Sequence, residues 1–305
     1  MEQELSADKM TFSVKPIEPQ RRNAFAGMVS GLDLRHRLTD AEVAAVHAGM
    51  DRYGVLVFRD QVLEDEQQIA FSRQLGELEQ ATGDIGDAKD RRVGMDLNDI
   101  SNLDRHGELL PRDDRRRLFG LGNQLWHSDS SFKEVPAKYS LLSARQIPTS
   151  GGNTEFADMR AAYDTLDEQT QREVHELICS HSQLFSRGIL GFDDFTQAEL
   201  QKWTPVRQRL VRRHPTTGLL SLYLSSDAGA IEGWPVPEAR AYLRDLTEHA
   251  TQRQLVHVHV WRQWDLVMWD NRVTMHRARR YAATEARDLR RTTLTNEVSS
   301  LDQAP

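Results

Sequence analysis

The sequence contains a single cysteine, Cys179, which excludes an internal disulfide bond and is typical of proteins of the reducing cytoplasm. It also lacks a basic excess: 39 Lys and Arg residues against 46 Asp and Glu residues give a net charge of −7, which does not favour nucleic acid or an anionic membrane. No apolar run approaches the roughly 20 residues of a membrane span, and the polar segment 1–9 lacks the apolar core of a secretory signal. We therefore expect a cytoplasmic protein with no nucleic-acid or membrane partner.

A regular alternation of strands and helices is also missing, which disfavours a Rossmann-type fold. Short apolar runs bounded by glycine and proline predict strands instead. Strands are expected at residues 54–58, 139–144, 153–157, 218–224, 255–261, 266–270, 273–275 and 292–294, and helices at 40–50, 63–75, 160–166, 167–179 and 235–251. The pattern predicts a mainly β fold with helices (α+β), in which a double-stranded β-helix (jelly-roll) core carries N-terminal and inserted helices. A single domain over residues 1–305 is expected.

Two segments are expected to differ from this core. Residues 1–20 are predicted to be a poorly ordered, frayed or extended lead-in. Residues 77–122 are polar and are interrupted by six glycines. Such a stretch is either a lid or substrate loop over a site, or a meandering surface segment with a couple of strands. The run Arg112–Arg117 within it is expected to be a solvated face.

The first candidate for chemistry is the stretch Asn123–Phe132, which contains His127 and Asp129. On a strand, side chains two residues apart project from the same face, so this pair could occupy two adjacent positions on one metal ion. One further histidine would complete the 2-His-1-carboxylate facial triad of non-haem iron sites, which leaves coordination positions open. The pair alone is a weak signal, because it occurs by chance in many proteins.

Among the eleven histidines, His276 is the best candidate for the third ligand. It follows a point where an apolar strand gives way to a polar turn, and Arg287 lies eleven residues beyond it. A guanidinium near a metal can hold a carboxylate through two parallel hydrogen bonds. His257 and His259 also share one face of a strand, but no acidic residue accompanies them in the sequence. They are expected on the exposed face of that strand.

Together these residues resemble the Fe(II)/2-oxoglutarate dioxygenases of the taurine dioxygenase family. Three longer stretches are similar to the 2,4-dichlorophenoxyacetate (aryloxyalkanoate) dioxygenase branch of that family. They are Asn123–Phe132, Gly151–Tyr163 and Asp265–Arg272, the last of which runs on to His276 and Arg291. The likeness extends from about Gly54 to Leu294, and the three motifs stand in the family's order and spacing.

The resemblance implies Fe(II) held by His127, Asp129 and His276, with O2 as the oxidant and 2-oxoglutarate as cosubstrate. Halogenating relatives lack the carboxylate at the position of Asp129, so its presence implies oxygenation. The resemblance further implies a homo-oligomer, as a dimer, trimer or tetramer.

The resemblance also assigns roles to four residues outside the triad. Thr154 and Arg287 would hold the distal carboxylate of 2-oxoglutarate. Arg291 would meet the anionic group of the primary substrate, and Asn123 would lie on the substrate side.

The implied substrate is a small anionic organic acid of the aryloxyacetate type, as in aromatic herbicide degradation. Hydroxylation next to its ether oxygen gives a hemiacetal, which collapses to a phenol and glyoxylate, while 2-oxoglutarate becomes succinate and CO2. Arg91, Arg92 and Arg291 could receive the substrate's charge. The segment before Asn123 differs from the herbicide-degrading branch, so a sulfonate, a sulfate ester or another small anion is an open alternative. A non-catalytic binding protein is disfavoured by the intact ligand set.

Overall fold

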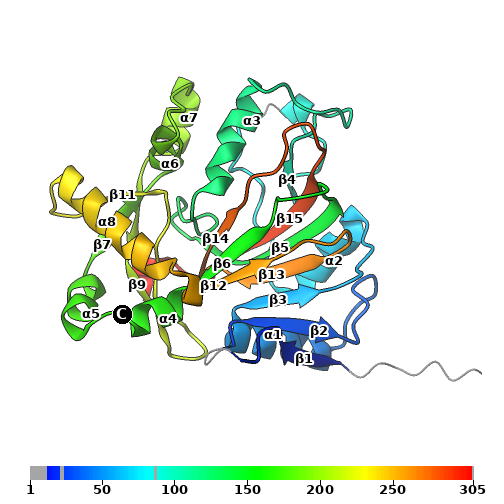
Figure 1. Ribbon diagram of the computed structural model, residues 1–305, viewed down its shortest axis with the longest axis horizontal. Helices are drawn as coiled ribbons and strands as arrows, with labels where there is room; N and C mark the ends of the chain where they lie inside the picture. Colours follow the sequence, from blue (N-terminus) through cyan, green and yellow to red (C-terminus); the bar gives the residue numbers. More distant parts are fainter. Residues whose placement is uncertain (1–11, 21–23, 86–87, 304–305) are drawn as a thin grey trace, which may run out of the picture.

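The largest element of the computed structural model, which describes residues 12–20, 24–85 and 88–303, is a seven-stranded sheet (Figure 1). Its strand order is β1-β2-β3-β13-β5-β15-β4, and neighbours are antiparallel except for β2 and β3. The strands are β1 Ser13–Pro16, β2 Ala26–Ser30, β3 Val55–Phe58, β4 Asn98–Ser101, β5 Ala137–Gln146, β13 Leu266–Asp270 and β15 Asp288–Thr295. The centre of this sheet is apolar, because β3 and β13 are buried over their whole length.

A second sheet has the order β12-β6-β14 and packs against one face of the first. Its strands are β12 Val256–His259, β6 Thr154–Asp158 and β14 Thr274–Ala278. Phe156 of β6 meets Trp269 of β13 with ring centroids 5.4 Å apart, within a core that also contains Val57, Leu142 and Leu289 of the large sheet. Two apposed, mainly antiparallel sheets with helices outside them confirm the predicted jelly-roll core.

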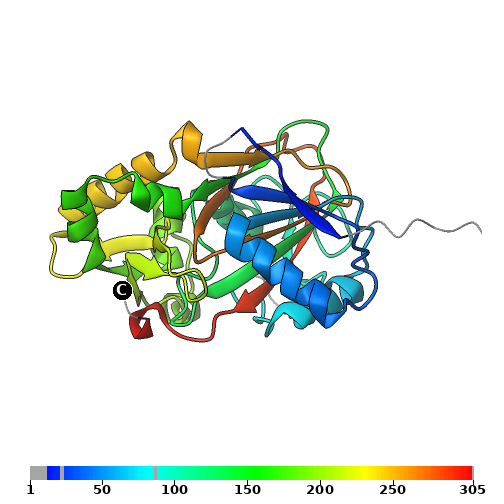
Figure 2. The same cartoon turned by 90° about the horizontal axis from the view of Figure 1, so that it is seen from below.

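Two helices cover the outer face of the large sheet: α1 Asp40–Tyr53 and α2 Asp65–Leu75 (Figure 2). The first begins at Thr39, whose hydroxyl accepts from the Glu42 amide while the Glu42 carboxylate accepts from the Thr39 amide. It ends at Gly54, whose φ of 75° is the left-handed conformation that glycine adopts without strain. The chain then turns directly into β3, so one short segment supplies both an outer helix and a central strand.

A long insertion between β6 and β12 packs on the outer face of the small sheet (Figure 1). Its elements are α4 Met159–Asp164, α5 Glu168–His175, β7 Ile178–His181, α6 Gln183–Ile189, α7 Gln197–Lys202, β8 Val206–Arg209, β9 Val211–Arg213, β10 Leu220–Leu222, β11 Ala228–Ile231, α8 Val236–Ala250 and the 3-10 turn η3 Arg253–Leu255. Leu243 and Leu246 of α8 join Ala157 of β6 and Met275 of β14 in one buried cluster. No helix in the described part of the chain has both the length and the apolar character needed to span a bilayer.

Two expectations from the sequence need correction, and the secondary structure of segment 77–122 can be given. Of the lead-in, residues 1–11 lie outside the described residues, whereas Ser13–Pro16 is an ordered edge strand that pairs with β2. The helix expected over residues 167–179 ends at His175, and the chain re-enters a sheet at Ile178. Segment 77–122 contains a strand, a helix and 3-10 turns: β4, α3 Arg115–Gly120, η1 Ala88–Asp90 and the start of η2 Leu121–Gln124.

The two faces of β12 are reversed relative to the prediction. His257 and His259 are 4% and 2% exposed, whereas Val258 between them is 45% exposed. Acidic partners account for this, because His257 bonds to Glu18 at 3.0 Å and His259 to Asp265 at 3.1 Å. Glu18 lies 239 positions away in the sequence and Asp265 lies six positions beyond His259, just before β13, so the alternation within β12 does not reveal either partner.

Candidate functional site

The candidate site is centred on a backbone bridge between His127 and His276, two residues 149 positions apart in the sequence. Each amide donates to the other's carbonyl, at 2.9 Å and 2.8 Å. His276 lies on strand β14. His127 does not lie on a strand: only this one residue is bridged, and the chain turns at Asp129. The expected strand geometry is therefore wrong, although the tight turn still directs both side chains to one point.

His127, Asp129 and His276 form a compact triad. One potential ligand atom from each residue lies within 4.8 Å of the others. The Asp129 carboxylate stands between the rings, 3.8 Å from Nε2 of His127 and 3.8 Å from Nε2 of His276. Two imidazole nitrogens and a carboxylate oxygen that converge in this way could hold a divalent metal on one face and leave the opposite face open.

Hydrogen bonds from three directions hold the Asp129 carboxylate and its backbone. Ser140 of β5 donates to Oδ2 at 2.7 Å, and Arg291 of β15 donates to Oδ1. The Asp129 amide donates to Asn271, which in turn bonds to Ser140. Burial raises the pKa of Asp129, but the positive charge of Arg291 and the hydrogen bond from Ser140 act in the opposite direction, and the pKa is lowered to about 2. The carboxylate is therefore ionised at neutral pH, as a metal ligand must be.

Both histidines are held in the neutral form. Burial lowers the pKa of His127, and burial together with the neighbouring His127 lowers the pKa of His276 well below its usual value. Nδ1 of His127 lies 2.8 Å from the Leu125 carbonyl, so this nitrogen carries the proton and Nε2 has a free lone pair. A neutral ring with a free Nε2 is the form that binds a metal.

Arg287 is a buried cation without a carboxylate partner. It is 4% exposed, and its Nε has no hydrogen-bond partner among the described residues. Its guanidinium donates to the Gly152 carbonyl at 3.4 Å and lies 5.7 Å from the centroid of the Tyr281 ring. Burial lowers the pKa of its guanidinium, and the smaller effect of Tyr281, which raises this pKa, does not offset it. A buried, uncompensated guanidinium costs free energy unless a ligand supplies the anion. Its environment therefore fits the carboxylate of a bound dicarboxylate such as 2-oxoglutarate.

Thr154, at the start of β6, is 3% exposed and its hydroxyl accepts from the Trp261 indole at 3.0 Å. The hydroxyl proton remains available to donate. Thr154 does not itself line the main cavity, unlike Arg287, Arg291 and Asn123. Of the residues predicted outside the triad, it is therefore the least accessible.

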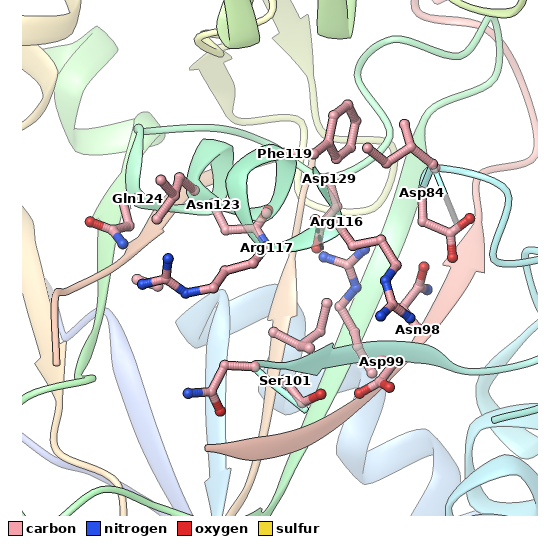
Figure 3. Close-up of a pocket in the computed structure, with 18 of the residues that line it drawn as sticks. Asp84, Asn98, Asp99, Ser101, Arg116, Arg117, Phe119, Asn123, Gln124 and Asp129 are labelled. Atoms are coloured by element: carbon pink, nitrogen blue, oxygen red, sulfur yellow. Dashed lines mark hydrogen bonds and ion pairs between the residues drawn. The ribbon is translucent and has the colours of Figure 1, made fainter. Parts of the chain in front are cut away.

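A cavity of about 280 Å³ opens beside the triad. Figure 3 shows α3 above it and β4 below it, with Asn123 and Gln124 at one side and Asp129 behind. Much of segment 77–122 therefore lines the cavity, including both elements that face one another across it.

The arginine run Arg112–Arg117 is not a solvated face throughout. Arg115 pairs with Glu199 at 2.6 Å and anchors α3, whereas Arg116 and Arg117 extend from α3 toward β4 (Figure 3). In a six-residue helix, consecutive side chains point in different directions, so a run of one residue type cannot all face solvent. The sequence contains no periodic signal for this, because the helix is shorter than two full turns.

Comparison with known proteins places the chain in a family. A family model described as "Taurine catabolism dioxygenase TauD, TfdA family" matches residues 13–293. The chain belongs to this family. The match extends from the first edge strand to the last strand of the large sheet, so it includes every residue of the site described above.

Two relatives with functional names and one solved structure are similar to this chain over most of its length. The alpha-ketoglutarate-dependent 2,4-dichlorophenoxyacetate dioxygenase of Cupriavidus pinatubonensis is 44% identical over 288 residues, covering 94% of this chain and 99% of the relative. The (S)-phenoxypropionate/alpha-ketoglutarate-dioxygenase of Delftia acidovorans is 37% identical and covers 82% and 85%. The crystal structure of AAD-2 with Mn(II) and N-oxalylglycine has a TM-score of 0.92 and 53% identity, and covers 95% and 100%.

These findings confirm the predicted enzyme class and cofactors. The protein is a dioxygenase that depends on Fe(II) and 2-oxoglutarate and uses O2. The buried histidine–carboxylate triad and the uncompensated Arg287 suit this pair of cofactors, because one site offers metal ligands and the other offers a counter-charge.

Proposed function

We propose that this dioxygenase hydroxylates an aryloxyacetate-type carboxylic acid at the carbon next to the ether oxygen. The relatives named for 2,4-dichlorophenoxyacetate and phenoxypropionate support this substrate class, since each is matched over more than four fifths of its length. The arginines that line the cavity are the single structural observation that favours an anionic guest.

Within this proposal, His127, Asp129 and His276 bind the iron, which would supply the activation of O2 coupled to decarboxylation of 2-oxoglutarate. Arg287 and Thr154 anchor the distal carboxylate of 2-oxoglutarate. Asn123 and Arg291 contact the primary substrate, and Arg291 also keeps the Asp129 carboxylate oriented through their hydrogen bond. The walls formed by α3 and β4 exclude water and direct one C–H bond toward the metal.

The overall reaction consumes the acid, O2 and 2-oxoglutarate, and it forms a phenol, glyoxylate, succinate and CO2. One oxygen atom enters the substrate and the other enters succinate. The hydroxylated carbon is a hemiacetal, so the bond between this carbon and the ether oxygen breaks without further oxidant. The ether oxygen stays on the ring as the phenol oxygen and takes the hydroxyl proton. No acid or base from the chain is required for that collapse.

A substrate panel tests the proposal. Succinate, phenol and glyoxylate are measured with 2,4-dichlorophenoxyacetate, phenoxypropionates, cinnamates and taurine as candidates. We expect phenol and succinate in equal amounts with the phenoxyacetate. Turnover of taurine alone would overturn the substrate assignment and favour a sulfonate dioxygenase, which would use the same iron and 2-oxoglutarate residues.

Alanine variants test the assigned ligands. We expect His127→Ala and Asp129→Ala to lower O2 uptake to background, whereas His36→Ala, whose side chain is 79% exposed, leaves it unchanged. Unchanged uptake in both site variants would refute the triad. A single catalytic domain, a lid role for residues 77–122, a cytoplasmic location and a homo-oligomer stay predictions.

A further inference from the structure

Eight arginines line the cavity, and six of them have a carboxylate within ion-pair distance. The six pairs are Arg91–Asp84, Arg92–Asp99, Arg116–Asp114, Arg187–Asp227, Arg279–Glu155 and Arg291–Asp129. Within the described part of the chain, Arg287 and Arg117 have none. The charge of Arg287 suits 2-oxoglutarate, so Arg117 is the cavity arginine whose charge is still uncompensated.

Arg117 is half-buried on α3, and its guanidinium donates to the Arg112 carbonyl of its own segment at 2.5 Å. Figure 3 shows it extending into the cavity below Asn123 and Gln124 and above Ser101. Its charge and that of Arg287 both act on the Tyr281 phenol, which also lines the cavity. Arg117 therefore lies near the cosubstrate's anchoring arginine but on a different wall.

The alternatives are less suited to a second anion. Arg91 and Arg92 form ion pairs at 2.7 Å and 2.8 Å, so a guest carboxylate would have to displace an existing partner. Arg291 shares its guanidinium with Asp129, and an incoming carboxylate there would lie beside a second negative charge. Arg117 needs to break only one hydrogen bond to a backbone carbonyl.

We propose that Arg117 is the principal counter-charge for the carboxylate of the primary substrate. The inference rests on the function proposed above, because it requires an anionic substrate. It makes Arg117 a specificity-determining residue and leaves Arg291, which is paired with Asp129, as a secondary contact. It also implies that bound substrate ties α3, and with it the end of segment 77–122, to the site.

The test compares Arg117→Gln with Arg112→Gln. Both variants remove one positive charge from the same segment, but Arg112 is exposed and does not line the cavity. An arginine–carboxylate contact contributes favourably to the binding free energy. Its loss should therefore raise the KM for 2,4-dichlorophenoxyacetate roughly 10- to 100-fold. We expect that rise in Arg117→Gln only, with the KM for 2-oxoglutarate and the thermal midpoint unchanged in both variants.

A binding measurement separates affinity from turnover. Calorimetric titration of 2,4-dichlorophenoxyacetate into protein loaded with Mn(II) and N-oxalylglycine should show the same weakening in Arg117→Gln. The neutral amide of the acid should bind wild type and variant equally, because it has no charge to compensate. A merely structural role for Arg117 would weaken both ligands alike.

Two results would overturn the inference: an unchanged substrate KM in Arg117→Gln, or a raised KM for 2-oxoglutarate, which would assign Arg117 to the cosubstrate. If the proposed function itself is wrong, the result is different: the wild-type enzyme forms no phenol from any phenoxy acid. In that case the same comparison is made with the acid that wild type does consume, and a selective rise in its KM supports Arg117 as the anion receptor.

Discussion

At the scale of single residues, the feature that most directly indicates ligand binding is a buried arginine that has no carboxylate partner among the described residues. Arg287 is buried at a cost in free energy, and within the described part of the chain the one hydrogen bond of its side chain is to the Gly152 carbonyl. Natural proteins rarely bury such a cation without a partner, so it is a stronger indicator of ligand binding than the many paired arginines nearby. The triad is different, because its ligands satisfy one another through the carboxylate of Asp129.

Replacement of Arg287 tests this distinction. We expect Arg287→Gln to raise the KM for 2-oxoglutarate roughly 10- to 100-fold, because a charged bidentate contact is lost. Its unfolding midpoint without ligands should be unchanged or higher, since the variant no longer buries an unpaired charge. Steady-state kinetics and thermal melts measure the two effects. A lower midpoint with an unchanged KM would show that Arg287 is structural.

His181 of β7 predicts a pH-dependent stability. It is fully buried against Tyr223, both ring nitrogens lack partners among the described residues, and burial lowers its pKa from 6.5 to about 4. The unfolded histidine binds a proton below about pH 6.5 and the folded one does not, so the free energy of unfolding falls as the pH is lowered through this window. At pH 5 the loss from this residue is about 2 kcal/mol.

The matched variant is His181→Phe, which retains a ring beside Tyr223 but cannot bind a proton. Chemical denaturation at pH 7.5 and at pH 5 should show wild type losing about 2 kcal/mol more than the variant, because all other groups titrate in both proteins. Equal losses in the two proteins would contradict the assignment of this pH dependence to His181.

At the scale of secondary structure, partners outside a strand or helix decide which of its faces is buried. The alternation of β12 predicts a strand but not which face is buried, and Glu18 and Asp265 bring the histidines inside. A similar long-range contact joins α4 to α1. Arg160 pairs with Asp158 and donates to the carbonyls of Asp51 and Tyr53, the last turn of α1, at 3.2 Å each.

Loss of Arg160 should therefore be costly. Arg160→Ala leaves Asp158 buried without its cation and two helix-end carbonyls without their donor, so we expect a loss of about 3 kcal/mol in the free energy of unfolding. Arg172→Ala is the control, because its pair with Glu168 on the next helix is 73% and 89% exposed and should be worth less than about 1 kcal/mol. Urea denaturation compares the two, and similar losses would contradict the buried-pair argument.

At the scale of the whole molecule, the site joins parts of the chain that meet only in the folded protein. His127 follows a 3-10 turn, His276 lies on the small sheet and Arg291 lies on the large sheet. Ligands that bind all of them should stabilise the folded state alone. The cavity between α3 and β4 exists only because segment 77–122 returns to pair with β15 at the edge of the large sheet.

This coupling can be measured by thermal unfolding. Mn(II) with 2-oxoglutarate should raise the unfolding midpoint, since a ligand at about 100 times its Kd adds about 2.7 kcal/mol to the free energy of unfolding. The shift should be lost in His276→Ala and retained in His36→Ala. An equal shift in His276→Ala would place the metal elsewhere.

The sequence by itself determined the family, the order of most strands and helices, and the residues that converge at the triad. Apolar periodicity and helix caps are local, so α1, α8 and the central strands could be predicted from short windows. The motif around His127 and Asp129 could be recognised although its predicted strand geometry was wrong, because a turn can direct the same two side chains to one point.

Only the tertiary structure decided which charges are compensated and which are available. Arg91, Arg92 and Arg117 look alike in the sequence, yet ion pairs occupy the first two and leave the third free to face the cavity. The same holds for the buried His257 of β12, whose acidic partner Glu18 lies 239 positions away in the chain. Electrostatic pairing acts over ångströms in space, whereas sequence patterns report only neighbours along the chain, so the choice among these arginines required the fold.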